Sequence, residues 1–348
     1  MMAPVYGKAV FSVSRQRRGI WYGCLLMKPD ITRTTAVFLE GARRPLIVIL
    51  GATASGKTAF SIELAKHVCG EIINADSRQL YRYLNIGTAK ITSAEMEEVP
   101  HHLIDVLDPK EEATIGKYQE SALTAIGAIL SRGNIPILVG GSMLYMSAIT
   151  DSLSLAPAKD DAIRHRLEVE YEKDAGASLY KKLQTVDPDA AAGTHPNNKP
   201  RIIRALEIYE LLRMPKSHAI SARGELRPRG SMEDRCAYDL LIFGIDRSPE
   251  ELKTRIPQRV DAMFDAGWID EVRNLLARGY TAADPGMKSH GYAEIIQYVQ
   301  ELERGGSESD IPAMQDALKK MITSRTRRYA KRQLTWWRGD ERIRWIRP

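Results

Sequence analysis

A glycine-rich stretch near residue 50 carries the residue types best suited to hold phosphate groups. It reads LIVILGATASGKTAF over 46–60, with Gly51, Gly56, Lys57 and Thr58 at the spacing G-x-x-x-x-G-K-T. An apolar run before the loop and a helical pattern after it predict a strand, a loop and a helix. In such a loop, backbone N–H groups, the lysine and the helix N-terminus hold adjacent phosphates, and the Thr58 hydroxyl ligates Mg²⁺. The sequence therefore predicts a phosphate site with Mg²⁺ as cofactor.

Two further polar residues each follow an apolar run. Asp76 comes directly after EIINA, and its carboxylate could act as a general base, hold Mg²⁺ or only cap the next helix. Ser142 follows a Gly-Gly pair, which lets the backbone approach a ligand closely. Its hydroxyl could donate to a phosphate or a leaving oxygen, or cap a helix.

The pattern of short apolar runs indicates which elements position these residues. The runs lie at 46–50, 71–75, 102–106, 135–139 and 240–245, and helical patterns at 57–68 and 118–133 separate the early ones. Near-continuous apolar strands that alternate with helices predict an α/β fold, a P-loop doubly wound parallel sheet. Ligands of such sheets bind beyond the carboxyl ends of the strands, so the loops at 51–58, 76–81 and 140–145 should meet at one rim.

The strand pattern stops between about 153 and 236. This stretch is helical and charged, for example at 160–173, and it closes with a Pro, Gly and charge-rich segment at 221–235 that reads as a flexible return. We predict a helical insertion at 153–236 within a core formed by 45–152 and 237–348. After the run at 240–245, the chain is expected to be helical to its end.

Residues 1–44 stand apart from this organisation. Residues 1–29 contain five Lys or Arg and no acid. A disordered leader or a start codon assigned too early is favoured over a transit peptide, which is also Arg-rich and poor in acids.

Composition restricts the class of protein. The chain has 348 residues, a net charge of +6 and a pI near 9.1. No apolar run approaches the ~20 residues of a membrane span, which predicts no membrane partner. Cys24, Cys69 and Cys236 are far apart, which excludes a disulfide framework or zinc spacing and fits a reducing, cytoplasmic location. The adjacent His101 and His102 read as structural, and no histidine pair has metal-ligand spacing.

Two basic segments point to nucleic acid. A predicted amphipathic helix at 200–212 places Arg201 and Arg204 on one face, which could also be merely solvated. Residues 317–338 hold eight Lys or Arg and no acid, interleaved with Tyr329, Trp336 and Trp337. Basic residues with aromatics suit phosphate contacts and base stacking.

Eight blocks occur in an order that resembles one known family. They are GATASGKT, ADSRQLY, NIGTAK, PHHLID, LVGGSMLY, HPN…PRIIRALE, HGYAE and AKRQLTWW, spread over about 45–346. This pattern resembles the tRNA dimethylallyltransferases, also called tRNA isopentenyltransferases. The resemblance implies transfer of a dimethylallyl group from dimethylallyl diphosphate to N6 of adenine 37 in the tRNA anticodon loop, by a monomer.

The resemblance also implies roles for individual residues. Asp76 corresponds to the family's base, Ser142 to a substrate-contacting threonine, and Arg259 to a second diphosphate-binding arginine. The diphosphate is assigned to Gly51, Thr53, Ala54, Ser55, Gly56, Lys57, Thr58 and Arg259, with Asp76, Ser142 and Lys57 as catalytic residues. The tRNA is assigned to Asp76, Ser77, Arg78, Gln79, Ser142, Arg164, Pro200, Arg201, Ile202, Ile203 and Arg204. The resemblance thus implies that the helical insertion at 153–236 binds tRNA.

The sequence departs from the family pattern at three places. Ser142 keeps the hydroxyl of the usual threonine. Pro200 replaces a common glutamine, which puts that tRNA contact in doubt, and His290 stands where an apolar residue is usual. The zinc finger of eukaryotic members is absent.

Three other functions fit part of the sequence. A P-loop kinase of small molecules would bind ATP and could use 153–236 as a lid. A prenyltransferase acting on free AMP or ADP would share the chemistry but would not need so wide a basic surface. A non-enzymatic RNA-binding module would leave the phosphate loop unexplained.

Overall fold

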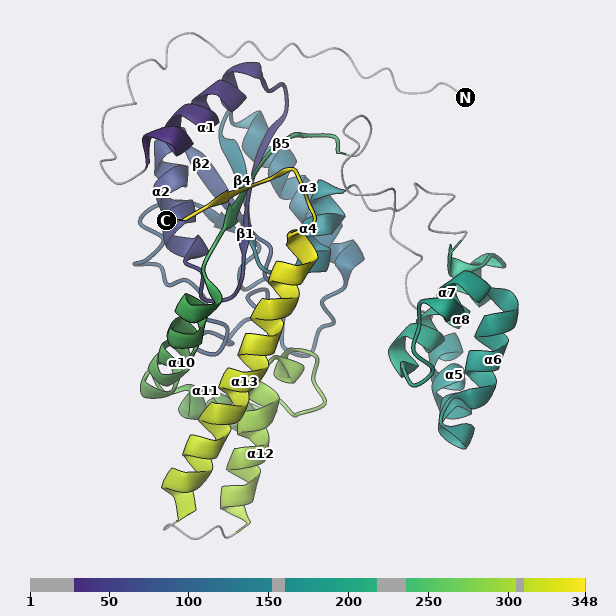
Figure 1. Ribbon diagram of the computed structural model, residues 1–348. Coiled ribbons are helices and arrows are strands. Elements are labelled where there is room, and N and C mark those ends of the chain that lie inside the picture. The colour runs from purple at the N-terminus through teal and green to yellow at the C-terminus, as the bar shows by residue number, and fades with distance from the viewer. Residues whose placement is uncertain (1–27, 152–159, 218–235, 305–309, 348) are drawn as a thin grey trace. The chain divides into compact units, whose positions relative to one another are not determined.

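The protein is described by a computed structural model that covers residues 28–151, 160–217, 236–304 and 310–347. Residue contacts divide the chain into two compact units, one of residues 1–151 with 234–348 and one of 152–233, each drawn in Figure 1. The second unit differs from the predicted insertion by one residue at its start and three at its end. The predicted return at 221–235, residues 1–27 and Cys24 lie outside the described residues.

The first unit is built on a six-stranded parallel sheet. Its strands are β1 (Pro45–Gly51), β2 (Gly70–Asn74), β3 (His101–His102), β4 (Ile135–Gly140), β5 (Asp239–Ile245) and β6 (Ile343–Ile346). The strand order is β3-β2-β4-β1-β5-β6, and every pairing is parallel. The predicted α/β class with a doubly wound parallel sheet is confirmed.

Helices cover both faces of this sheet. They are α1 (Pro29–Gly41) and α2 (Lys57–Val68) on one face, and α3 (Ile115–Ser131) and α4 (Met143–Thr150) on the other (Figure 1). Along β1, Leu46 and Val48 point into the core beneath α3 and α4, while Ile47 and Ile49 point into the core beneath α1 and α2. Burial on both sides explains why β1 reads as a continuous apolar run.

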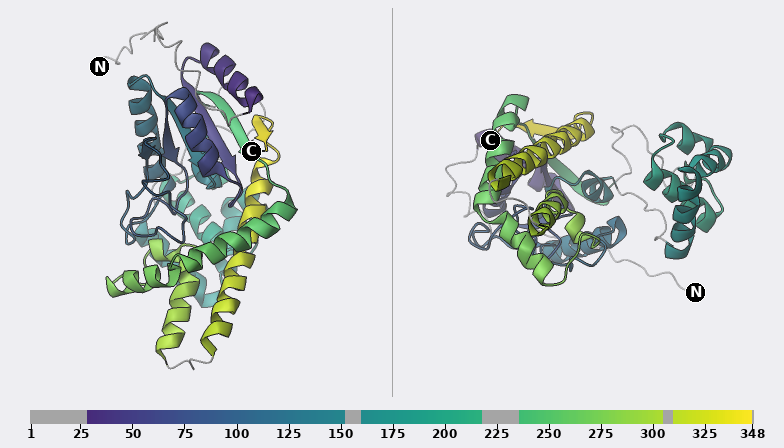
Figure 2. Two further views of the ribbon diagram at one scale, coloured as in Figure 1. Left: turned by 90° about the vertical axis from the view of Figure 1, so that its left-hand side faces the viewer. Right: turned by 90° about the horizontal axis from the view of Figure 1, so that it is seen from below.

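A helical layer lies beyond the carboxyl ends of the strands (Figures 1 and 2). It consists of α10 (Pro249–Asp265), α11 (Trp268–Ala277), a short turn η2 (Gly286–Lys288), α12 (Tyr292–Glu303) and α13 (Ile311–Trp337). The buried ring of Trp268 lies at the centre of its core. A Cβ built on Gly87 or Gly291 would lie 2.2 or 2.1 Å from that ring, so the NIGTAK and HGYAE blocks need glycine for close packing.

Three sequence predictions about this unit were wrong. The run at 102–106 does not continue as a strand beyond His102, where β3 (His101–His102) ends, because Leu103 and Asp105 adopt left-handed backbone angles. The chain after β5 is not wholly helical, since the short β6 pairs with β5. The leader boundary at residue 44 is also wrong, because α1 packs Ile31 into the core between the sheet and α2.

The second unit is a helical bundle. Its described helices are α5 (Asp161–Asp174), α6 (Ala177–Val186), α7 (Pro188–Ala192) and α8 (Lys199–Leu212). Its own core contains Leu167, Leu179, Leu183, Ile202 and Leu206. In neither unit is a described helix both long and apolar enough to cross a membrane.

Candidate active site

The phosphate loop joins β1 to α2 at the rim predicted from the sequence. A Cβ on Gly51 would lie 2.9 Å from Ser55 Oγ and 3.0 Å from the Ile245 carbonyl oxygen, so the loop closes tightly only with glycine there. Gly56 has a φ of 99°, a left-handed angle that favours glycine at the start of α2. The buried Ser55 Oγ has no hydrogen-bond partner in the described structure. The loop therefore presents a polar side chain and a helix N-terminus, which together suit an anion.

The side chain of Lys57 folds back onto the phosphate loop that precedes it. Its Nζ donates to the Gly51 carbonyl at 3.1 Å and to the Ala52 carbonyl at 2.9 Å. Burial and the nearby Arg259 lower the pKa of Lys57 to about 8, while Asp76 acts in the opposite direction. Burial also lowers the pKa of Arg259, and Asp76 again opposes the shift. Two cations and one carboxylate from three distant parts of the sequence thus share one electrostatic environment.

Two further arginines hold the loop and were missed by sequence reasoning. Arg247 Nε donates to the Ser55 carbonyl at 3.2 Å, and Arg255 Nε donates to the Ala54 carbonyl at 2.8 Å. Arg255 stands four residues before Arg259 on α10, so the two share a helix face. That spacing was a signal in the sequence, whereas nothing local connected Arg247 to the loop.

Asp76 is fixed by its own turn. Asn74 Oδ1 accepts from the Asp76 N–H at 2.9 Å, and Asn74 Nδ2 donates to the Asp76 carbonyl at 3.0 Å. Asp76 Oδ1 accepts from the Arg78 N–H at 2.9 Å. Asp76 does not cap a helix, because a turn at 77–80 follows it. The contact with the Arg78 N–H holds the carboxylate at the rim, where it acts electrostatically on Lys57 and Arg259.

Ser142 supports that turn. It precedes α4 but makes no side-chain cap; instead its Oγ accepts from the Ser77 N–H at 3.0 Å and lies 3.2 Å from Ser77 Oγ. A Cβ on Gly140 would lie 2.3 Å from the Ala75 carbonyl oxygen, so the glycine lets the end of β4 approach the segment that leads from β2 to Asp76. The loops after β1, β2 and β4 meet at one rim, as their places in the sequence predict.

This rim and this fold can be compared with known proteins. A family model described as IPP transferase matches residues 79–340. The chain belongs to the IPP transferase family. It is 42% identical to a tRNA dimethylallyltransferase of Symbiobacterium thermophilum over 87% of this chain and 89% of that protein. It is also 42% identical to one of Geobacter metallireducens, over 88% and 94% of the two chains.

Solved structures of similar proteins agree with this assignment. A full-length tRNA isopentenylpyrophosphate transferase of Bacillus halodurans has a TM-score of 0.60 at 37% identity and covers 88% of this chain and 90% of its own. A eukaryotic dimethylallyltransferase described as acting on tRNA has a TM-score of 0.71 at 27% identity, over 87% of this chain and 74% of its own. The family predicted from the eight sequence blocks is confirmed.

In this member of the IPP transferase family, the residues predicted to contact tRNA at 76–79 differ in exposure and in the hydrogen bonds that their side chains already make. Arg78 is exposed. Ser77 is bonded to Ser142, and Gln79 Nε2 donates to the carbonyls of Thr88 and Ala89 at 3.2 and 3.1 Å. The side chain of Gln79 thus holds the NIGTAK loop in place, a role that the sequence did not suggest.

The other predicted tRNA residues lie in the second unit. Ile202 and Ile203 on α8 are buried in its core, so their side chains form no surface, contrary to a role as side-chain contacts. Pro200 and Arg201 are exposed at the start of that helix. The structure describes this unit separately from the rim of Asp76.

The basic residues of the second unit are partly paired. Arg204 contacts Glu207 at 2.8 Å, and Arg164 contacts Glu168 at 3.3 Å. Burial, with Arg201 and Arg204 nearby, lowers the pKa of Lys216. Arg201 and Arg204 therefore both act on Lys216, although Arg204 is also paired with Glu207.

Helix α13 carries the basic segment 317–338. The exposed basic residues on it are Lys320, Arg325, Arg327, Arg328, Lys331 and Arg332, with Arg338 at its end. The interleaved aromatics are not a stacking surface, however. Trp337 is only 3% exposed, Trp336 packs against the core beneath α3 and α4, and Tyr329 OH donates to the Gly141 carbonyl at 3.4 Å. The basic prediction fits the described surface of this helix, and the prediction of aromatic stacking was wrong.

The histidines have structural contacts. His101 Nδ1 lies 2.8 Å from the Val99 carbonyl, and His102 Nε2 lies 2.7 Å from Glu71 Oε2. His290 Nε2 lies 2.8 Å from Thr326 Oγ1, so it joins the start of α12 to α13. The unusual residue of the HGYAE block therefore has a packing role.

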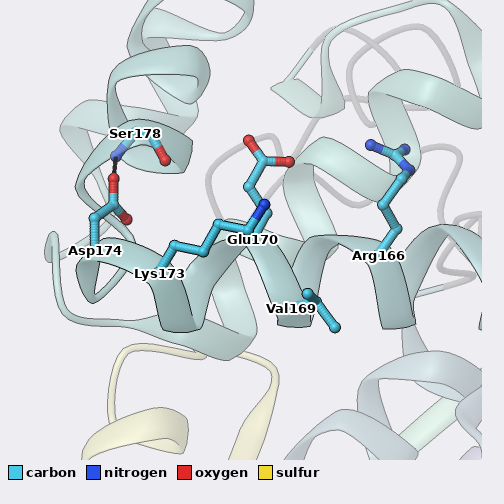
Figure 3. Close-up of a pocket in the computed structure, with 6 residues that line it drawn as sticks. All are labelled: Arg166, Val169, Glu170, Lys173, Asp174 and Ser178. Carbon is cyan, nitrogen blue, oxygen red and sulfur yellow. Dashed lines mark hydrogen bonds between the residues drawn. The ribbon is translucent and has the colours of Figure 1, made fainter.

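The second unit has a surface pocket, shown in Figure 3, whose lining includes none of the predicted site residues. It is lined by Arg166, Val169, Glu170, Lys173, Asp174 and Ser178. Asp174 accepts from the Ser178 N–H at 2.9 Å, and Arg166 pairs with Glu210. Asp174 and Arg166 are therefore held by contacts within the helical unit.

Proposed function

We propose that this protein transfers a dimethylallyl group from dimethylallyl diphosphate to N6 of adenine 37 in the tRNA anticodon loop. The products are N6-isopentenyladenosine and free diphosphate, in tRNAs that read codons beginning with U. The observation that carries the proposal is the meeting of Lys57, Arg259 and Asp76 at one rim. We further propose that it acts as a monomer in the cytoplasm.

The phosphate loop would hold the diphosphate of the donor. The N–H groups at the start of α2 and the cations Lys57 and Arg259 supply positive charge in a partly buried site, where electrostatic stabilisation is strong. The same charges would stabilise the diphosphate as the bond between its oxygen and the allylic carbon breaks. The role of Lys57 is thus larger for the departing group than for the bound donor.

The residues at this rim also fit a magnesium ion. Among the described residues, no cluster of three His, Cys, Asp or Glu could hold a metal. Mg²⁺ bound to phosphates needs only one or two protein oxygens, and the exposed Thr58 at the start of α2 offers a hydroxyl beside the phosphate loop. When bound there, the ion would neutralise charge on the leaving diphosphate.

Asp76 would act on the acceptor. The lone pair of adenine N6 is delocalised into the ring, so N6 attacks poorly unless its proton is removed. The Asp76 carboxylate would take that proton as the new N6–carbon bond forms, a contribution of typically 10²- to 10⁴-fold. To reach it, the adenine must leave its stack in the anticodon loop. The exposed Arg78 and the basic residues of α13 would hold the surrounding phosphates.

The test supplies each candidate substrate separately. The protein is incubated with labelled dimethylallyl diphosphate or labelled ATP, and with unmodified tRNA or AMP. We expect label in tRNA from the prenyl donor alone, without ATP, and no transfer by Lys57→Ala. ATP hydrolysis that is lost in Lys57→Ala would instead support the kinase, and prenylation of AMP would support the mononucleotide enzyme. Binding of tRNA with no turnover of either donor would support the non-enzymatic RNA-binding module.

A further inference from the structure

One side-chain amide is bonded to two loops of the rim at once. Gln333 on α13 is 1% exposed. Its Oε1 accepts from the Thr53 N–H at 2.9 Å, and its Nε2 donates to the Gly141 carbonyl at 2.8 Å. A Cβ built on Gly141 would lie 2.4 Å from this Nε2, so the second loop has room for the amide only because residue 141 is glycine.

These two bonds belong to a longer series. Gly141 is followed by Ser142, whose Oγ accepts from the N–H of Ser77, the residue after Asp76. The series therefore runs from the phosphate loop through Gln333 to the turn that carries the proposed base. The amide oxygen and the amide nitrogen of Gln333 are both hydrogen-bonded, so only one orientation of the side chain makes both bonds.

We propose that Gln333 is a positioning residue, which fixes the distance between the phosphate loop and the Asp76 turn. The inference rests on the proposed function, because prenyl transfer requires the allylic carbon and the attacking nitrogen to be aligned. A misplacement of ~1 Å in such an alignment can cost about 10²-fold in rate. Gln333 bonds the loop at Thr53, the end farther along the chain from Lys57 and Thr58, so it orders the loop from the side opposite the start of α2.

The test uses Gln333→Met, which keeps the length of the side chain and removes both hydrogen bonds. Hydrogen exchange of the amides in 51–58, with and without inorganic diphosphate, reports the order of the loop. Single-turnover prenyl transfer at saturating tRNA and donor reports the alignment. The matched control is Thr326→Val, because Thr326 is also buried on α13 and hydrogen-bonded to His290 but does not touch the rim.

We expect Gln333→Met to raise loop amide exchange at least tenfold and to slow single turnover by roughly 10- to 100-fold, the scale of lost alignment. Its affinity for inorganic diphosphate should stay within about threefold of the wild-type value. Thr326→Val should show wild-type loop exchange and a wild-type rate once the folded fraction is taken into account. Should Gln333→Met not fold, Gln333→Asn keeps the polarity but is too short to span both loops, and the same results are expected.

Either of two results would overturn the positioning role. One is a rate within threefold of wild type together with unchanged loop exchange. The other is an equal loss of rate in the Thr326 control. A wild-type protein that transfers no prenyl group would contradict the proposed function, and the exchange of 51–58 would then decide by itself whether Gln333 orders the loop.

Discussion

The titration of Lys57 offers the sharpest test of the electrostatics at the rim. Burial and Arg259 lower the pKa of Lys57 to about 8 from its ordinary 10.5. With that pKa, about nine-tenths of the free protein carries a charged Lys57 at pH 7 and about one-tenth at pH 9. The bound diphosphate ester carries three negative charges when fully ionised, which favours the charged lysine and raises its pKa.

The affinity for the donor should therefore depend on pH in one direction. Below pH 8 Lys57 is already charged, so binding has no protonation cost. Above pH 8 the lysine must take up a proton on binding, and the dissociation constant should rise by about tenfold per pH unit. The donor contributes no slope there, because a terminal phosphate with a second pKa of about 6 is fully ionised.

The assay is calorimetric binding of the non-reactive thio analogue of dimethylallyl diphosphate from pH 7 to 9.5, in buffers of different ionisation enthalpy. At pH 9 we expect uptake of about 0.9 proton per analogue bound. Lys57→Arg stays charged throughout, so its affinity should show no break. Arg259→Met should move the wild-type break to higher pH and Asp76→Asn to lower pH, since these groups shift the pKa of Lys57 in opposite directions. A flat wild-type profile without proton uptake would refute this reasoning.

The remaining predictions concern the base, the basic helix and a scaffold contact. Asp76→Asn should slow single-turnover prenyl transfer by about 10²-fold or more and keep tRNA and donor binding within about tenfold at neutral pH. A rate within threefold of wild type, or one restored by added Mg²⁺, would contradict the role as base. Neutralising Arg327 and Arg328 together should reduce the slope of log tRNA affinity against log salt by roughly one to two units. An unchanged slope would mean that this face is only solvated. Glu271 accepts from the N–H groups of Asn85 and Ile86 and from Tyr292 OH. Glu271→Ala should therefore lower the free energy of unfolding in urea by about 2 to 4 kcal/mol. A loss below about 1 kcal/mol would show that water replaces these bonds.

Short-range patterns in the sequence predicted the centre of the site. The phosphate loop, Asp76 and Ser142 each follow a buried strand, and the carboxyl ends of parallel strands meet at one rim whatever their order in the sheet. Such inferences need only the residue types and their local periodicity. For the same reason no local pattern predicted β6, a four-residue strand whose partner lies about a hundred residues earlier.

The groups that surround this centre were decided by tertiary structure. Arg247 reaches the phosphate loop from nearly two hundred residues away, and Gln333 from still farther. No local pattern states which loop a distant side chain will meet, because that depends on how the helical layer packs on the sheet. The assignment of Arg259 to the diphosphate came from the family resemblance, because the periodicity of its helix does not indicate which loop it meets.

Helix α13 combines features that the sequence predicted with features that only its packing decided. Its composition alone predicted a basic helix. Its buried residues Leu318, Ile322, Ala330 and Trp337 recur at multiples of helical spacing, so the sequence also held the signal that Trp337 faces a core. What the sequence by itself determined was thus the type of each element and the chemistry it carries. Only the tertiary structure decided which face each element turns to its neighbours, because the burial of a face is a property of the contact between two elements and not of either one alone.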